Sequence, residues 1–258
     1  PLADPFILGI SSGSSLGVAA VILIVGGGGA AVLTAGLGLG GDLAVVVASA
    51  IGSGLVMALV LLLGQAVRSS ATLLLIGVMI GYLVSAGVSI MISFSTPQLI
   101  AAYSRWGFGN YGGVTWAELP LILVVVGSGL LASLLLVKPL NALLLGERYA
   151  QSMGLNLKAV RMALIALTSV LAGTVTAFCG PIQFLGIAVP HLARGTFNTS
   201  DHRILFPATA LMGALLALTA DIISGLPGDS VLPLNAINAA FGAPVVIWIL
   251  LQRRRLAL

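Results

Sequence analysis

Charged side chains are scarce in this chain, and their scarcity excludes a water-soluble protein. Only 7% of its 258 residues are Asp, Glu, Lys or Arg, whereas 59% are hydrophobic. A soluble domain carries charge on roughly a quarter to a third of its surface positions, and this sequence has too little to do so. With a mean hydropathy of +1.17, the composition indicates an integral membrane protein.

Cysteine and nucleotide-binding motifs are also lacking. Cys179 is the single cysteine, which excludes an intrachain disulfide and a multi-cysteine metal site, and we interpret it as a small apolar core residue. The glycine run at Gly26 to Gly29 lacks the Lys-Ser/Thr ending of a phosphate loop, so we expect an outer turn there. We expect no cofactor, and any ATP hydrolysis must belong to another subunit.

Apolar runs long enough to cross about 30 Å of hydrocarbon recur along the chain. They predict an all-α, polytopic transmembrane helical bundle with eight membrane-embedded helices. The predicted ranges are 9–26, 43–66, 71–93, 119–137, 158–178, 182–193, 206–225 and 235–251. The sixth is too short to cross alone, so we expect it inside the bundle beside a non-helical break at GPIQF. Such a break at membrane depth is buried in protein or lines a cavity.

The basic residues predict the orientation in the membrane. With the N-terminus in the cytoplasm and sides alternating, ten of the eleven Lys and Arg fall inside, and Arg105 is the exception. The net charge of +4 therefore reflects topology and does not indicate nucleic-acid binding. Glycines spaced by four residues, at Gly9, Gly13 and Gly17, predict close contact between helices.

The segment from Lys138 to Arg161 is too polar to span a bilayer. Its apolar residues recur at near-helical spacing, and Gly146 and Gly154 divide it into two short helices. Such an amphipathic pair on the cytoplasmic face fits the groove of a protein partner. The alternative is an interfacial helix lying on lipid, in which Glu147 and Arg148 are simply solvated.

The second polar segment runs from Pro190 to Arg203 and holds both histidines, His191 and His202. A zinc site formed with Asp201 is one reading, but it lacks further converging ligands. A hydrolase using Ser200 lacks the strained turn that presents such a nucleophile. We favour helix-end chemistry: Pro190 perturbs a helix end, His191 and Arg194 complement its dipole, and Ser200 or Asp201 caps the next helix.

These residues resemble the FecCD-type permeases, the membrane subunits of ATP-binding-cassette importers for iron-siderophores, haem and cobalamin. The similarity includes GPIQFLGIAVPHLAR, the SDHRILFPATALMGALLALTAD segment, LADPFILGISSGSSLG, ALLLGERYAQSMGLN and FGAPVVIWIL, and it covers essentially the whole chain. The signature residues matched here are Gly180, Ile182, Phe184, Gly186, Pro190, His191, Arg194, Asp201, His202, Arg203 and Asp221.

The resemblance implies a ten-helix fold in which the LADP motif follows the second helix. This chain, 1–258, would then be a single permease domain carrying helices three to ten, and N-terminal sequence would be missing before Pro1. The segment 141–155 matches the family's coupling helices, which dock on the ATPase subunit. The coupling candidates are Asn141, Leu145, Gly146, Glu147, Arg148, Ala150, Met153 and Gly154.

The resemblance also implies partners. They are cytoplasmic ATPase subunits, a periplasmic substrate-binding protein and a second permease copy, in the inner membrane of a bacterium. Arg105 and Trp106 are outer-face candidates, because this Arg could attract an anionic ligand or an acidic binding-protein lobe. An Arg facing lipid headgroups beside interfacial aromatic residues is the other reading.

Four positions depart from the family pattern. Gln183 stands where a small residue is common, Asn235 replaces a frequent Gly, and Gly225 lies where an Arg often helps to dock the binding protein. Arg105 stands where an uncharged residue is expected.

We therefore expect an import permease without chemistry of its own, moving a bulky chelate by alternating access. Its nearly charge-free spans favour such cargo over a bare ion. The alternative is a secondary transporter driven by an ion gradient, with Asp221 as the coupling carboxylate. A membrane enzyme using the two histidines is a third reading. The motifs do not separate haem, siderophore and cobalamin as cargo.

Overall fold

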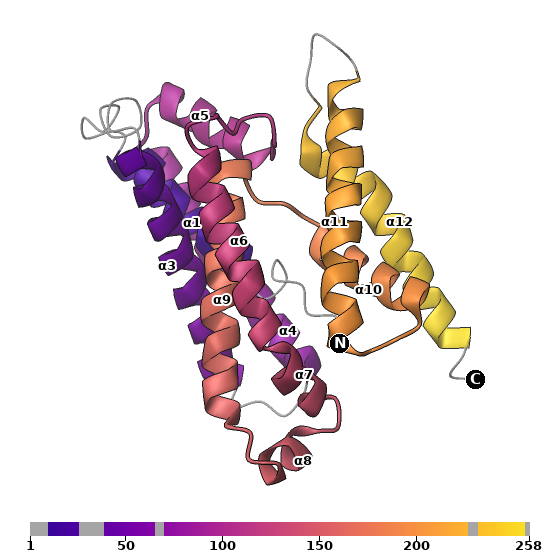
Figure 1. Ribbon diagram of the computed structural model, residues 1–258. Coiled ribbons are helices and arrows are strands. Elements are labelled where there is room, and N and C mark those ends of the chain that lie inside the picture. Colours follow the sequence, from indigo (N-terminus) through magenta and orange to yellow (C-terminus); the bar gives the residue numbers. More distant parts are fainter. Residues whose placement is uncertain (1–9, 26–38, 65–69, 227–231, 256–258) are drawn as a thin grey trace. The chain divides into compact units, whose positions relative to one another are not determined.

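The computed structural model describes residues 10–25, 39–64, 70–226 and 232–255. Within these ranges every regular element is helical, as the composition predicts (Figure 1). The chain divides into two compact units, which are described separately. Among the described residues, one unit contains those in 10–131 and 163–181, and the other contains those in 132–162 and 182–255.

The larger unit is built from the first helices of the chain. They are α1 (Ile10–Ala19), the π-helix η1 (Ala20–Val25), α3 (Leu39–Gly64), α4 (Ser70–Ser93) and α5 (Pro97–Gly107). Most of α6 (Leu119–Leu135) and α9 (Leu157–Cys179) belongs to it as well. The apolar core between α1, α3 and α4 contains Val56, Val60, Ile80 and Val84.

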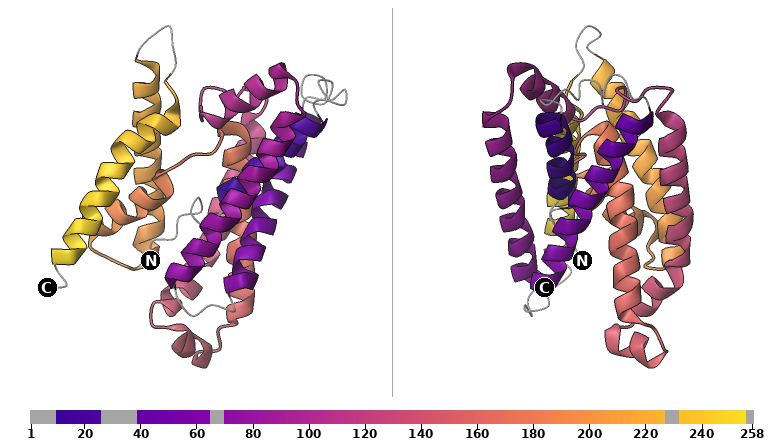
Figure 2. Two further views of the ribbon diagram at one scale, coloured as in Figure 1. Left: turned by 180° about the vertical axis from the view of Figure 1, so that it is seen from behind. Right: turned by 90° about the vertical axis from the view of Figure 1, so that its left-hand side faces the viewer.

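The second unit holds two short helices and three long ones. They are α7 (Val137–Leu143), α8 (Glu147–Ser152), α10 (Leu185–Phe197), α11 (His202–Gly225) and α12 (Leu234–Arg255). Figure 2 shows α10, α11 and α12 packed against one another. The start of α11 also contacts α7, and this contact positions the site described below.

Small residues bring α1 and α3 into backbone contact. A Cβ atom added at Gly13 would overlap the carbonyl oxygen of Gly52, and one added at Gly17 would overlap that of Ala48. The prediction of close packing at Gly13 and Gly17 is confirmed. Two serines of α3 tie this pair to α9: Ser49 donates to the carbonyl of Gly173 at 2.8 Å, and Ser53 to that of Ser169 at 3.1 Å.

Each of the eight predicted ranges contains a helix. The boundaries differ by a few residues, as at the end of the sixth, predicted at 193 and found at Phe197. The short helix α5 was not predicted, because its mixed composition shows neither a long apolar run nor strong stop signals. It begins with Pro97, which is well suited to the first turn because its missing N–H has no intrahelical partner there.

Three helical segments in the described part of the chain are long and apolar enough to cross a membrane: Leu75–Ser93, Leu157–Cys179 and His202–Gly225. A fourth is counted if α6 and α7, bent by 48°, form one span. The protein is therefore a multi-pass membrane protein, and the full number of eight spans stays a prediction.

Two features singled out in the sequence include residues outside the described ranges: the LADP motif with Gly9, and the Gly26 to Gly29 run.

Candidate functional site

Two glycines shape the segment between α7 and α9. Gly146 precedes α8 with φ 103° and ψ 151°, and Gly154 follows α8 with φ 85°. Side-chain-bearing residues rarely adopt such backbone angles, so glycine is required for conformation here. A Cβ at either position would meet no other atom within 4 Å, so neither glycine is needed for space. The predicted division into two short helices at these glycines is confirmed.

The helix α8 and the residues that flank it expose large apolar side chains. Leu145 is 65% exposed, Tyr149 54% and Met153 53%, whereas Ala150 is completely buried. Glu147 occupies the first turn, where a negative charge complements the helix dipole, and it pairs with Arg161 at 2.7 Å. Both side chains of this pair are largely exposed, so it adds little stability. The result is a small apolar surface that the rest of the described chain leaves uncovered.

Asn141 joins this helix pair to the second polar segment. Its Nδ2 donates to Asp201 Oδ1 at 2.6 Å, and its Oδ1 accepts the backbone N–H of His202 at 2.9 Å. His202 Nδ1 lies 2.7 Å from the same oxygen. A carboxylate only accepts, so the contact with Asp201 fixes the orientation of the amide. The two polar segments singled out in the sequence thus form one junction, at α7 and the start of α11.

Asp201 caps α11, as predicted. Its Oδ1 accepts the backbone N–H of Arg203 at 2.9 Å, and its own N–H donates to Thr199 Oγ1 at 3.1 Å. The hydrogen bond from the Arg203 backbone, and then that from Asn141, hold the pKa of the Asp201 carboxyl below its ordinary value. The carboxylate therefore stays charged and holds the amide of Asn141 in place.

Two details predicted for the second polar segment are wrong. Pro190 lies inside α10, which continues to Phe197, so His191 is not at the helix end and does not act on the terminal dipole. The proline removes only the bond to the carbonyl of Gly186, a loss that membrane helices tolerate. Arg194 does lie in the last turn, as predicted, and Asn198, in left-handed conformation at φ 47°, ends the helix.

Most of the second polar segment is helical, whereas a loop was expected. Gly186, Pro190, His191 and Arg194 belong to α10, and His202 and Arg203 begin α11. The connection consists of residues 198–201 alone. In the described part of the chain, no three His, Cys, Asp or Glu residues gather closely enough to hold a metal ion.

Gly180 and Trp106 belong to the larger unit and form a second tight contact. Gly180 has φ 77°, and a Cβ there would overlap the backbone oxygen of Trp106. Trp106 Nε1 donates to the carbonyls of Thr176 and Ala177, each at 3.1 Å. The indole therefore anchors α5 to the end of α9, while Arg105 beside it is exposed. This anchoring role of Trp106 was not visible in the sequence.

Two departures from the family pattern contact each other in the smaller unit. The backbone N–H of Gln183 donates to Asn235 Oδ1 at 3.2 Å, which ties the break before α10 to the first turn of α12. The next residue, Phe184, has φ 66°, a strained value for an aromatic residue, and its Cβ lies against Gly242. Gly225 ends α11.

Comparison with known proteins gives consistent results. The sequence model of the FecCD transport family matches residues 1–252. The vitamin B12 import system permease protein BtuC of Escherichia coli O9:H4 (strain HS) is 37% identical over 257 residues, covering 99% of this chain and 74% of the relative. The protein of the same name from Klebsiella pneumoniae subsp. pneumoniae is 36% identical over 255 residues, covering 98% and 73%.

A solved structure has a similar fold. It is an inward-facing conformation of a metal-chelate type ABC transporter, with a TM-score of 0.78 and 26% sequence identity. The alignment covers 98% of this chain and 77% of that one.

Proposed function

The chain belongs to the FecCD transport family, and from this premise we propose that it is the membrane-spanning permease subunit of an ATP-binding-cassette importer. Its cargo is a bulky chelate: cobalamin, the vitamin B12 named for its relatives, or an iron chelate or haem, in keeping with the metal-chelate transporter of similar fold. The permease moves it by alternating access into the cytoplasm across the inner membrane of a bacterium. ATP hydrolysis takes place on a separate subunit.

The observation that carries this proposal is the junction at Asn141. An exposed apolar helix pair is a suitable surface for a cytoplasmic partner, and Asn141 links it to the first residue of an apolar span. A push on α8 thus has a short, hydrogen-bonded route to α11. Interfaces of this kind shift between discrete arrangements, which is the requirement for alternating access.

In this proposal the segment 141–155 contacts the ATPase. Leu145, Tyr149 and Met153 supply the apolar surface, and Gly146 and Gly154 set the angle of α8. Arg148, in the first turn of α8, and the Glu147–Arg161 pair border that surface. The rest of the partner set comprises a substrate-binding protein on the outer face and a second copy of the permease.

The experiment is reconstitution of the chain with its ATPase and binding protein in proteoliposomes. Uptake of labelled cobalamin, a ferric siderophore and haem is measured with ATP, with a non-hydrolysable analogue and without nucleotide. We expect uptake of one cargo that needs ATP hydrolysis and survives an ionophore. Uptake that persists without the ATPase and collapses with the ionophore would instead establish the secondary transporter, with Asp221 as its coupling residue.

A further inference from the structure

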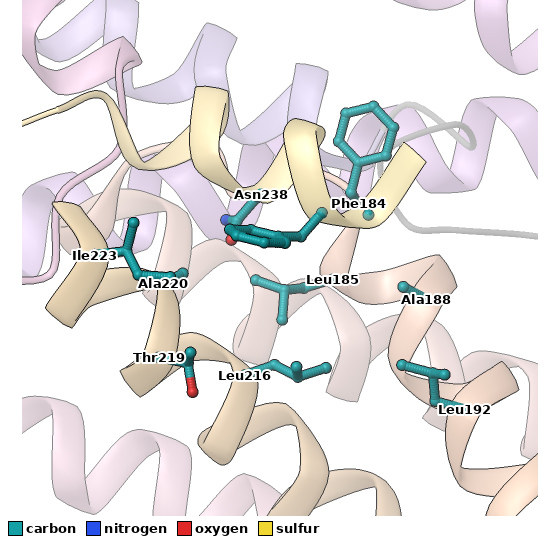
Figure 3. Close-up of a pocket in the computed structure, with 11 residues that line it drawn as sticks. Phe184, Leu185, Ala188, Leu192, Leu216, Thr219, Ala220, Ile223 and Asn238 are labelled. Carbon is teal, nitrogen blue, oxygen red and sulfur yellow. The ribbon is translucent and has the colours of Figure 1, made fainter. Parts of the chain in front are cut away.

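A cavity of about 260 Å³ lies between α10, α11 and α12 of the smaller unit. Figure 3 shows Ile223, Ala220 and Thr219 of α11 at one side of this space and Ala188 and Leu192 of α10 at the other. Apart from Thr219 and Asn238, the side chains that line it are leucine, isoleucine, alanine and phenylalanine, with one glycine. Such walls favour an apolar occupant.

One hydrogen-bond donor in this cavity is unused. Asn238 is only 6% exposed, and its Nδ2 has no hydrogen-bond partner. Thr219 cannot take its place as donor, because its hydroxyl already donates to the carbonyl of Leu215 at 2.7 Å. A buried amide N–H without a partner costs free energy, so an occupant with an acceptor oxygen would relieve that cost.

The lining also sets the charge of the occupant. No charged side chain is among the residues that border the cavity. A bound ion would therefore be desolvated without a counter-charge, which is unfavourable in an apolar environment. The group that enters is neutral, mainly apolar, and carries an oxygen acceptor.

The position of Asn238 along α12 indicates the depth of this donor in the bilayer. Asn238 lies four residues after Leu234, where α12 begins. At 1.5 Å per residue, that is about 6 Å from the helix start. The headgroup region on each side of a bilayer is roughly 5–8 Å thick. In the predicted arrangement, in which α12 begins at the bilayer surface, the amide would lie near the boundary between headgroups and hydrocarbon. Ester carbonyls of lipids lie at this level.

We propose that the cavity binds the acyl ester of a bilayer phospholipid, whose carbonyl accepts a hydrogen bond from Asn238 Nδ2. The acyl chain lies along the apolar walls from Leu185 to Leu192 and from Leu216 to Ile223. The surrounding bilayer supplies this chemistry at high concentration. In the orientation predicted from the basic residues, α12 begins at the outer face, so the lipid comes from the outer leaflet.

The test uses the permease in complex with its ATPase, freed of lipid in detergent. Native mass spectrometry measures binding of two phosphatidylethanolamines with the same chain lengths, one with ester linkages and one with ether linkages. An ether lacks the carbonyl acceptor, so the wild-type complex is expected to bind the diester about three- to tenfold more tightly. Equal binding of the two lipids would overturn the proposal.

Three variants make the result specific. Asn238→Leu removes the donor at nearly constant volume and should abolish the preference for the ester. Asn238→Gln keeps the amide donor on a longer side chain and should retain part of the preference, which guards against a misfolded Leu variant. Ala188→Phe fills the cavity and should weaken binding of both lipids.

Two further outcomes would count against the proposal. One is an ester preference that survives in Asn238→Leu. The other is displacement of the lipid by cobalamin or a ferric chelate with protection of the same residues, which would assign the cavity to the cargo.

Discussion

One oxygen atom of Asn141 contacts two nitrogen atoms of His202. Asn141 Oδ1 accepts the backbone N–H of His202 at 2.9 Å and lies 2.7 Å from Nδ1 of its side chain. An amide oxygen only accepts, so Nδ1 carries a proton in this arrangement. The two residues are 61 positions apart in the sequence. Their contact is what makes α7 and α11 move as one body in the proposed mechanism.

Asn141→Ala is therefore expected to uncouple ATP hydrolysis from transport. The substitution removes two hydrogen bonds to His202 and one to Asp201, so it should lower the free energy of unfolding by about 1.5–4.5 kcal/mol, from roughly 0.5–1.5 kcal/mol each. Transport per ATP hydrolysed in proteoliposomes should fall more than the unfolding temperature does. Asn156→Ala is the matched control, because Asn156 Oδ1 bonds only locally, to the N–H of Ala159.

Asn141→Asp distinguishes the contact with His202 from the contact with Asp201. A carboxylate still accepts from His202, but it cannot donate to Asp201 and it faces a second negative charge. Coupling should fall in this variant too. Normal transport per ATP in both Asn141 variants, with reduced stability, would show that the junction only supports the fold.

Gly146→Ala tests the geometry of α8. The positive φ of 103° costs a residue with a Cβ roughly 1–3 kcal/mol, although the space around it is open. The backbone is expected to relax and turn α8, so ATPase binding measured by co-purification should weaken. Gly195→Ala in α10 is the control: it also meets no atom within 4 Å and has no positive φ. If ATPase binding weakens equally in both variants, the backbone of Gly146 does not set the angle of α8.

Gly52→Ala tests the α1–α3 contact. The added Cβ would overlap the backbone oxygen of Gly13, so the helices must separate, at a cost of about 1–3 kcal/mol for overpacking. The unfolding temperature in detergent should fall. Gly54→Ala, two residues along α3, meets only Ser169 atoms at 3.8 Å and beyond and should be neutral. A neutral Gly52→Ala would contradict backbone contact between the helices.

The sequence predicted helix positions well and the connections between them poorly. Apolar runs located α3, α4 and α11 because membrane spans must be apolar along their whole length. Gly146 and Gly154 were recognised as breaks because glycine is the residue that tolerates their backbone angles. The Asn141–His202 contact joins residues far apart in sequence, and no local pattern encodes it. The prediction that Pro190 lies at a helix end was wrong, because the free-energy cost of a proline inside a helix depends on which groups surround the helix.

Acid should weaken the cap of α11. Because the pKa of Asp201 is lowered in the folded protein, its stabilising effect is fully present above the ordinary value of 3.8. It is lost as the pH falls through the lower, folded value. Because the stabilisation is already complete above the ordinary pKa, this group should add no pH dependence to the stability between about pH 6 and 8. Asp201→Asn should remove part of the stability loss seen below about pH 4 in acid unfolding curves, and identical curves would contradict the assignment.

Arg105 and Trp106 are adjacent in α5 but should respond differently to substitution. Trp106→Phe keeps an aromatic ring and removes the Nε1 donor to Thr176 and Ala177, so the free energy of unfolding should fall by at least about 0.5–1.5 kcal/mol. Arg105 is exposed and should leave stability unchanged when it becomes Glu. If it attracts an acidic lobe of the binding protein, Arg105→Glu should slow association several-fold at low salt, and the difference should shrink as salt increases. If the wild type and Arg105→Glu associate at equal rates at every ionic strength, Arg105 does not face the binding protein, and the reading in which it faces lipid headgroups holds. Only a charge close to the partner makes the association rate depend on salt.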